Sequence, residues 1–385
     1  MPSGFRKFTA LVGAAALAFT LGSTAPASAQ VDGIDASSLG EGGVGSIVEG
    51  IGSVPLGSTA ELLGSVGSSG FPPIGSGSVE SVPEPSPVDD SITESEFLRV
   101  DRRSGDYEYW IVTSAAMQRE ITVEVVPSRG EGAAPVLYML DGIGAPVRST
   151  GWNHQGDIAE RLAGENVHVV NPAGAPASYY SDWIADDPVL GRYKWETFLT
   201  EELPGIVAGR LETTGKSAVG GISMGGQAAM HLAANHPELY QGVMSFSGNY
   251  STMDQLGYQT IRISVESRGG DMDNMWGPHG SERWRYHDTV SHPEKLRDTA
   301  VYFSAGSGAI GPDDVEEYGE RVERMVLGTI LERGSLEGSR KFERALDRAG
   351  VEHRADYSAT GMHNWPNFIK NFDAGWNHIK PALQN

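Results

Sequence analysis

The chain has 385 residues, a formal net charge of −21 and no cysteine. The negative charge argues against nucleic acid and anionic membrane surfaces as partners. The absence of cysteine excludes disulfides, thiolate metal sites and a cysteine nucleophile, and we expect no cofactor and no bound metal ion.

The N-terminus has the pattern of an export signal. Two basic residues precede the apolar run Phe8–Leu21, and the small-residue motif Ala27-Ser28-Ala29 follows it. This order predicts a secretory signal peptide over residues 1–29, cleaved between Ala29 and Gln30. The apolar run is too short to span a membrane comfortably. We therefore expect an exported protein, either secreted or associated with the cell envelope.

The next segment has the composition of a linker. Residues 31–97 hold 11 acidic and no basic side chains, and glycine, serine and proline fill much of the rest. Their isolated apolar residues bury too little surface to offset the entropy of ordering the chain. We predict a flexible linker over residues 30–96 and one folded domain over residues 97–385.

The domain alternates strand and helix patterns. Segments 107–112 and 120–126 predict an opening hairpin, and the continuous apolar run Pro135–Leu140 is typical of a strand inside a parallel sheet. Further strands are predicted at 167–170, 242–246, 299–304 and 354–358. Helices are predicted at 157–162, 196–210, 315–349 with a break near Gly334, and at the C-terminus. Residues 249–295 look irregular and predict a lid. The alternation favours an α/β fold with a doubly wound, mostly parallel sheet and helices on both faces.

One motif gives the domain a candidate chemistry. Gly221-Ile222-Ser223-Met224-Gly225 follows a β-favouring run and precedes an Ala-rich helical run. This is the G-x-S-x-G nucleophile elbow in its strand–turn–helix context, and Ser223 is the candidate nucleophile. The start of the following helix favours a developing negative charge beside it. The motif alone also occurs as a simple glycine-rich turn in other α/β proteins.

A serine nucleophile needs a base and an orienting acid, which in this fold follow in the order serine, acid, histidine. Of the ten histidines, His363 alone falls in a short loop just after the last predicted strand. His279, His287 and His292 in the lid region are weaker candidates.

The acid cannot be chosen by pattern alone. Nine acidic residues that lie between Ser223 and His363 in the chain are candidates: Asp313, Asp314, Glu316, Glu317, Glu320, Glu323, Glu332, Glu337 and Glu343.

Several ordered motifs resemble the secreted mycolyltransferases, the antigen 85 complex and its corynebacterial relatives, which belong to the esterase branch of the α/β-hydrolase superfamily. The resemblance covers roughly residues 98–385. The motifs are Leu140-Asp141-Gly142, Tyr180-Ser181-Asp182-Trp183, Tyr193–Thr200 with Glu202-Leu203-Pro204, Met275-Trp276-Gly277-Pro278, Gly361-x-His363-x-Trp365 and Lys380-Pro381-x-Leu383-Gln384.

The resemblance implies roles for particular residues. The acid would be Glu332, because Leu331-Glu332 stands ten residues before Phe342 as in that family, with Glu337 and Glu343 as fallbacks. The oxyanion hole would be the backbone N–H groups of Ile143 and Met224, and for Met224 the elbow motif predicts the same.

The resemblance also implies a reaction, in which a mycolyl group passes from trehalose monomycolate through an acyl-serine to a second trehalose monomycolate or to cell-wall arabinogalactan. Asp141, Asn364 and Trp365 are candidate sugar contacts. An arginine that holds trehalose in mycobacterial members is replaced by Gly144, and Arg148 lies nearby in a shifted position. The alternatives are a secreted carboxylesterase, a protein O-mycolyltransferase and a non-enzymatic adhesin.

Overall fold

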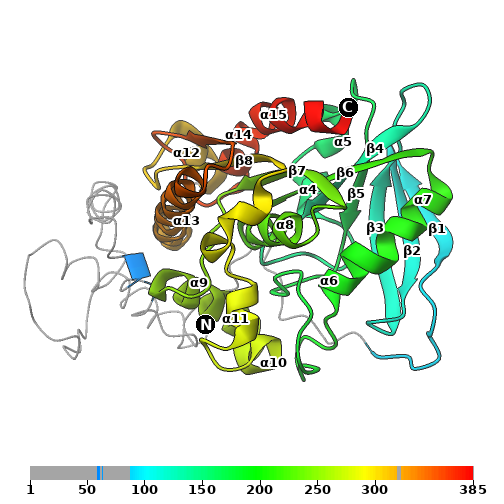
Figure 1. Ribbon diagram of the computed structural model, residues 1–385, viewed down its shortest axis with the longest axis horizontal. Coiled ribbons are helices and arrows are strands. Elements are labelled where there is room, and N and C mark those ends of the chain that lie inside the picture. Colours follow the sequence, from blue (N-terminus) through cyan, green and yellow to red (C-terminus); the bar gives the residue numbers. More distant parts are fainter. Residues whose placement is uncertain (1–58, 61–62, 64–86, 319–321, 385) are drawn as a thin grey trace, which may run out of the picture.

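The domain is organised around one sheet. The computed structural model describes residues 59–60, 63, 87–318 and 322–384. Within these residues, nine strands form a single sheet in the order β1-β2-β3-β5-β4-β6-β7-β8-β9 (Figure 1). The first three strands and their contact with β5 are antiparallel, and all pairings from β5 to β9 are parallel.

The strands are β1 (Phe97–Ser104), β2 (Tyr107–Ser114), β3 (Arg119–Val126), β4 (Ala134–Leu140), β5 (His168–Pro172), β6 (Thr213–Ile222), β7 (Tyr240–Phe246), β8 (Ala300–Ala305) and β9 (His353–Tyr357). The helical elements are α4 (Gly151–His154), α5 (Ile158–Arg161), α6 (Trp195–Thr197), η3 (Phe198–Glu202), α7 (Leu203–Arg210), α8 (Ser223–Asn235), α9 (Gln255–Glu266), α10 (Met272–Trp276), α11 (Glu282–Tyr286), η4 (Thr289–Ser291), η5 (Pro293–Leu296), α12 (Pro312–Tyr318), α13 (Val322–Ala349), α14 (Trp365–Lys370) and α15 (Phe372–Gln384).

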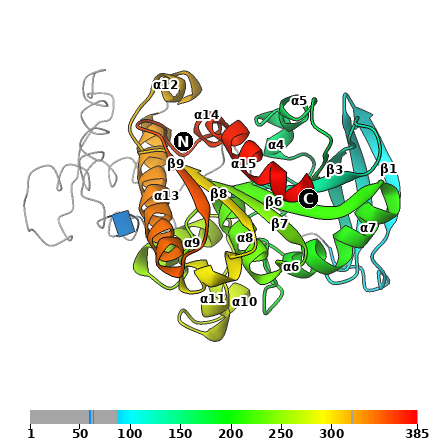
Figure 2. The same ribbon diagram turned by 45° about the horizontal axis from the view of Figure 1, so that its top comes forward.

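The central strands are apolar because both faces of the sheet are covered. Along β4, Val136 and Tyr138 pack into one core, together with α8, while Leu137 and Met139 pack into the other, together with α15. This alternation follows from the two-residue period of a strand. Figure 2 shows α4, α14 and α15 on one side of the sheet and α8 and α9 on the other. The predicted doubly wound arrangement is confirmed.

Three details differ from the sequence prediction. Strand β1 was not predicted, and it pairs with β2 at the edge of the sheet. The predicted irregular lid contains the helices α9, α10 and α11. Helix α13 runs through Gly334 without a break, because a glycine inside a helix costs only about 1 kcal/mol and packing can offset it.

The predicted signal peptide, residues 1–29, and most of the predicted linker, residues 30–96, lie outside the described residues. Two described residues of that linker, Thr59 and Leu63, are buried. The Leu63 carbonyl accepts a hydrogen bond from Arg262 of α9 at 3.5 Å. Within the described part of the chain, no helix is both long and apolar enough to cross a membrane.

Candidate active site

Ser223 stands at the sharp turn between β6 and α8. Its φ of 52° lies in the left-handed region that a non-glycine residue rarely adopts. Gly225 makes this turn possible, because a Cβ there would lie 2.4 Å from the Asp141 carbonyl oxygen. The strained turn therefore holds the serine hydroxyl above the C-terminal edge of the parallel strands, where sites of this fold class lie.

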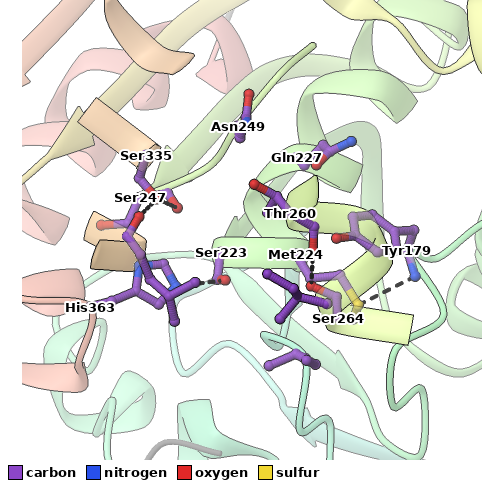
Figure 3. A pocket seen from close by; sticks show the side chains of 13 residues that line it. Tyr179, Ser223, Met224, Gln227, Ser247, Asn249, Thr260, Ser264, Ser335 and His363 are labelled. Carbon is purple, nitrogen blue, oxygen red and sulfur yellow. Dashed lines mark hydrogen bonds between the residues drawn. The ribbon is translucent and has the colours of Figure 1, made fainter. Parts of the chain in front are cut away.

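His363 reaches Ser223 from the loop between β9 and α14. Its Nε2 lies 2.8 Å from Ser223 Oγ (Figure 3). The loop is fixed by backbone and side-chain contacts: the His363 N–H donates to the Gly328 carbonyl at 3.0 Å, and the Tyr318 hydroxyl donates to the His363 carbonyl at 3.1 Å. The imidazole is thus held at one position relative to the serine.

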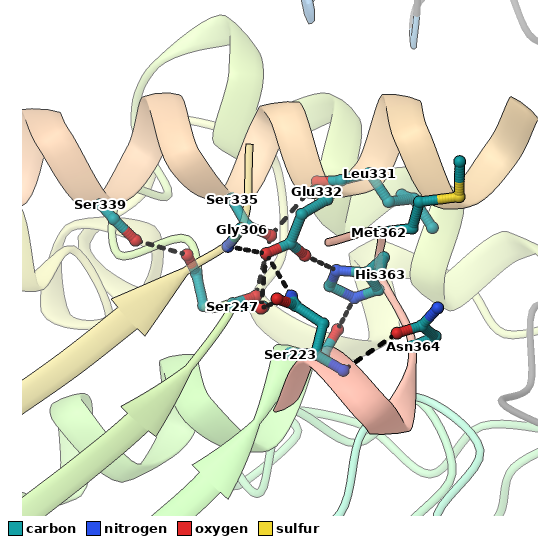
Figure 4. Close-up of polar contacts among 12 residues, drawn as sticks. Ser223, Ser247, Gly306, Leu331, Glu332, Ser335, Ser339, Met362, His363 and Asn364 are labelled. Carbon is teal, nitrogen blue, oxygen red and sulfur yellow. Dashed lines mark hydrogen bonds and ion pairs between the residues drawn. The ribbon is translucent and has the colours of Figure 1, made fainter. Parts of the chain in front are cut away.

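Glu332 lies on α13 behind the imidazole and is 0% exposed. Its Oε2 is 2.8 Å from His363 Nδ1. Its Oε1 accepts hydrogen bonds from Ser247 Oγ at 2.8 Å, Gly306 N at 2.5 Å and Asn367 Nδ2 at 2.8 Å (Figure 4). A buried carboxylate is costly unless its oxygens are hydrogen-bonded, and these donors satisfy it.

This geometry suits one tautomer of the imidazole, in which Nδ1 carries the ring proton and donates it to Glu332 Oε2. Nε2 is then free to accept the hydroxyl proton of Ser223. The three groups can act as nucleophile, base and orienting acid in acyl transfer.

A pocket opens beside Ser223. Its space unfilled by atoms, including the open mouth, is about 510 Å³. Ile143 from the loop after β4 and Met224 from the start of α8 line it together with Ser223 and His363. Figure 3 shows Tyr179 at the same wall, where its N–H donates to Met224 Sδ at 3.3 Å. Burial raises the pKa of the Tyr179 hydroxyl, which therefore stays protonated.

The N–H of Met224 is available for an oxyanion. Met224 is the second residue of α8, and the first four N–H groups of a helix have no partner within the helix. Ile143 follows Gly142, where an added Cβ would lie 3.5 Å from Ser223 Cβ. The structure thus brings both predicted oxyanion residues beside the nucleophile.

The lid region and α13 also contribute to the pocket wall. Thr260, Ile263 and Ser264 of α9, together with Leu331 and Ser335 of α13, face the same space. The wall therefore mixes apolar side chains with hydroxyl groups. The region predicted as a lid supplies part of the site.

Sequence reasoning missed the supports of Glu332. Ser247 follows β7 and Gly306 follows β8, so both lie at the edge of the sheet where parallel strands end. That position was a usable signal for residues near the site. The contact of Asn367 depends on how α14 packs, which no local pattern encodes.

The three predicted sugar contacts lie near the site but do not line the pocket. The Asp141 carboxylate accepts the Gly151 N–H at 2.9 Å, at the start of α4. Asn364 caps α14 by accepting the Asn367 N–H at 3.1 Å and donates to Asp314 at 2.7 Å. The Trp365 ring packs edge-on against Trp152. All three predicted side chains are buried, and direct contact with a sugar stays a prediction.

The alternative residues lie elsewhere. The fallback acid Glu343 accepts a hydrogen bond from the Tyr357 hydroxyl at 2.9 Å, and Glu337 is half-buried on α13. His279, a weaker candidate for the base, contacts the Thr252 carbonyl at 3.2 Å. Arg148 is exposed and is not part of the pocket wall.

Comparisons with known proteins show the family of the chain. The family model described as putative esterase matches residues 114–379. The chain is 32% identical to diacylglycerol acyltransferase/mycolyltransferase Ag85B of Mycobacterium avium, over 72% of this chain and 82% of that protein. It is 34% identical to Ag85B of Mycobacterium leprae, over 72% and 83%. The crystal structure of Mycobacterium tuberculosis MPT51 (FbpC1) matches with a TM-score of 0.62 and 28% identity, over 73% of this chain and all of that one.

Proposed function

Because the chain belongs to the putative esterases and to the Ag85 mycolyltransferase family, we propose that it transfers a mycolyl group from trehalose monomycolate to a sugar hydroxyl. The acceptor is a second trehalose monomycolate or cell-wall arabinogalactan. The predicted signal peptide, residues 1–29, would place the enzyme outside the cell, at its envelope, where such acceptors are found.

The proposed reaction has two half-reactions. Ser223 Oγ attacks the ester carbonyl while His363 Nε2 takes the hydroxyl proton, and Glu332 stabilises the resulting imidazolium. The tetrahedral intermediate collapses, trehalose leaves with the proton from His363, and an acyl-serine remains. The acceptor hydroxyl then gives its proton to His363 and attacks the acyl-serine, and His363 returns that proton to Ser223 Oγ as the bond between the serine and the acyl group breaks.

The backbone N–H groups of Ile143 and Met224 are proposed to stabilise the oxyanion in both half-reactions. Losing one such donor typically costs about 3 kcal/mol of transition-state stabilisation. The proposal draws support from their joint position in the pocket wall with Ser223 and His363.

The observation that supports the proposed mechanism most strongly is the position of His363 between Ser223 and Glu332. Both hydrogen-bond distances are 2.8 Å. The acid has three further donors on its other oxygen, which hold the carboxylate in place. A histidine in a purely structural role would not need this order of partners.

Hydrolysis is the second candidate function. The family description is that of an esterase, and the same three residues could pass the acyl group to water. Gly144 stands where the resemblance places an arginine that holds trehalose, and Arg148 is exposed and lies outside the pocket wall. The acceptor can therefore be water as well as a sugar.

Product analysis separates the two functions. Purified protein is incubated with trehalose monomycolate, and the lipids are identified by mass spectrometry. Trehalose dimycolate as the main product supports the transferase, whereas free mycolic acid alone supports the esterase. Ser223→Ala should abolish both products, and products that persist in this variant would contradict the role of Ser223.

A further inference from the structure

A buried cluster of potential metal ligands lies behind the elbow helix, away from Ser223. It consists of Glu196 from α6, His231 from α8 and His287 at the end of α11, which are 7%, 3% and 3% exposed. One ligand atom of each residue lies within 4.8 Å of the others. We propose that these three side chains bind one divalent transition-metal ion, with zinc the best match.

The separation of two ligand atoms suits zinc. Zn–N and Zn–O bonds of about 2.0–2.1 Å in a tetrahedron place neighbouring ligand atoms about 3.4 Å apart. Glu196 Oε1 and His231 Nε2 are 3.4 Å apart. The ligand atom of His287 lies within 4.8 Å of the other two, so it must move toward them by up to about 1.4 Å to reach the same separation.

The Nε2 atoms of both histidines are buried polar atoms that are left unsatisfied in this structure. Neither His231 Nε2 nor His287 Nε2 has a hydrogen-bond partner, although both are buried. Buried polar atoms are nearly always satisfied, and an unsatisfied one calls for an explanation such as an ion. Two imidazoles and one carboxylate form a ligand set that zinc uses in proteins, with a fourth position open to water.

Neighbouring side chains hold the proposed ligands in place. The Tyr286 hydroxyl donates to Glu196 Oε1 at 2.7 Å, and His236 Nε2 lies 3.1 Å from the same oxygen. The Trp276 ring stacks on His287, with ring centroids 4.1 Å apart. Such outer contacts fix the orientation of metal ligands. Tyr286 is itself 37% exposed, so the cluster lies one residue below the surface.

Metal binding requires the Asn235 side chain to exchange its contacts, which now include the bond from Nδ2 to the His231 carbonyl at 3.0 Å and the bond from Lys295 Nζ to Oδ1 at 2.6 Å. Zinc on His231 Nε2 leaves the ring proton on Nδ1, which faces the Asn235 amide nitrogen at 3.1 Å. That amide must turn its oxygen toward the ring to accept the proton.

The role of such an ion would be structural. His231 belongs to the helix that Ser223 begins, while His287 ends a helix of the lid region. One ion would crosslink α8, the end of α11 and α6. The expectation of no metal site rested on the absence of cysteine, whereas these ligands come from three distant segments.

The test begins with the full-length protein, stripped with a chelator and then given one equivalent of zinc sulfate. After dialysis against zinc-free buffer, elemental mass spectrometry should find one zinc per chain, and zinc should raise the melting temperature reversibly. His287→Gln and Glu196→Gln should each lose the retained zinc and the shift, while His378→Gln on α15 should keep both. No retained zinc, or equal retention in the ligand variants, would overturn the proposal.

A cobalt spectrum decides the question even if a ligand variant fails to fold. Cobalt in place of zinc should give the intense visible absorption of a four-coordinate ion in the unmodified protein. The weak spectrum of aqueous, six-coordinate cobalt would contradict the site.

Discussion

At the scale of single residues, the proposed chemistry depends on which proton His363 carries. The Glu332 carboxylate, fully buried with three donors on Oε1, leaves Oε2 to accept from Nδ1. The amide of Glu332→Gln would present an N–H to the ring and favour the tautomer with its proton on Nε2, which cannot accept the Ser223 proton. We expect kcat for acyl transfer to fall by about 10⁴-fold, with little change in KM.

Steady-state kinetics of Glu332→Gln can be compared with matched changes on the same helix. Glu337→Gln and Glu343→Gln should keep most of the activity, because neither carboxylate contacts His363 in this structure. If Glu332→Gln kept full activity and one of the controls lost it, the orienting acid would be that control's glutamate and not Glu332.

A variant of Asn364 distinguishes a structural role of this residue from direct contact with the sugar. Its side chain caps α14 and binds buried Asp314 at 2.7 Å. We expect Asn364→Ala to lower the free energy of unfolding by about 1–2 kcal/mol, with an unchanged KM for trehalose monomycolate, measured by chemical denaturation and kinetics. An unchanged stability with a strongly raised KM would instead favour the predicted sugar contact.

At the scale of elements, the turn from β6 to α8 depends on backbone atoms that approach closely. A Cβ on Gly225 would lie 2.4 Å from the Asp141 carbonyl and 2.6 Å from the Leu140 carbonyl. Backbone atoms cannot move aside as a flexible side chain can, so Gly225→Ala should destabilise the domain by about 1–3 kcal/mol and also displace Ser223.

Gly209, near the end of α7, is the matched control. A Cβ there meets nothing within 4 Å, so Gly209→Ala should be neutral or stabilising by up to about 1 kcal/mol. Thermal unfolding compares the two variants. Equal melting temperatures would mean that the turn is less tightly packed than described.

Part of the fold and of the candidate site could be predicted from the sequence. The elbow, β4 and the position of His363 were predictable because each has a local pattern: a glycine-flanked serine, an unbroken apolar run, and a loop after the last strand. Glu332 was not, since eight other acidic residues shared its interval and only the family resemblance selected it. Burial on α13 and contact with Nδ1 are tertiary properties that no spacing along the chain encodes.

The cluster of Glu196, His231 and His287 is a further example. Its members come from α6, α8 and α11, and their approach depends on how the lid packs against the elbow helix. The sequence indicates His287 only as a weaker candidate for the base, because a single histidine in an irregular segment gives no information about its neighbours in space.

At the scale of the whole molecule, the sheet and the candidate site lie between residues 97 and 384. Among the described residues before 87, Thr59 and Leu63 are buried. A chain that begins at Pro87 should therefore fold cooperatively and keep acyl transfer, with a melting temperature lower by a few degrees, since burial of one leucine contributes about 1.5–3 kcal/mol. Calorimetry and product analysis would check this, and failure to fold would place the N-terminal segment within the domain.

In the proposed reaction the acyl group is bound to Ser223 before it reaches a sugar, and a pulse-chase experiment tests this step most directly. The protein is mixed with isotope-labelled acyl donor, part is quenched and digested for peptide mass spectrometry, and the rest is chased with trehalose. We predict that the label maps to the peptide containing Ser223 and then moves to trehalose faster than to water. Label on another residue, or release only as free acid, would contradict the proposed transfer.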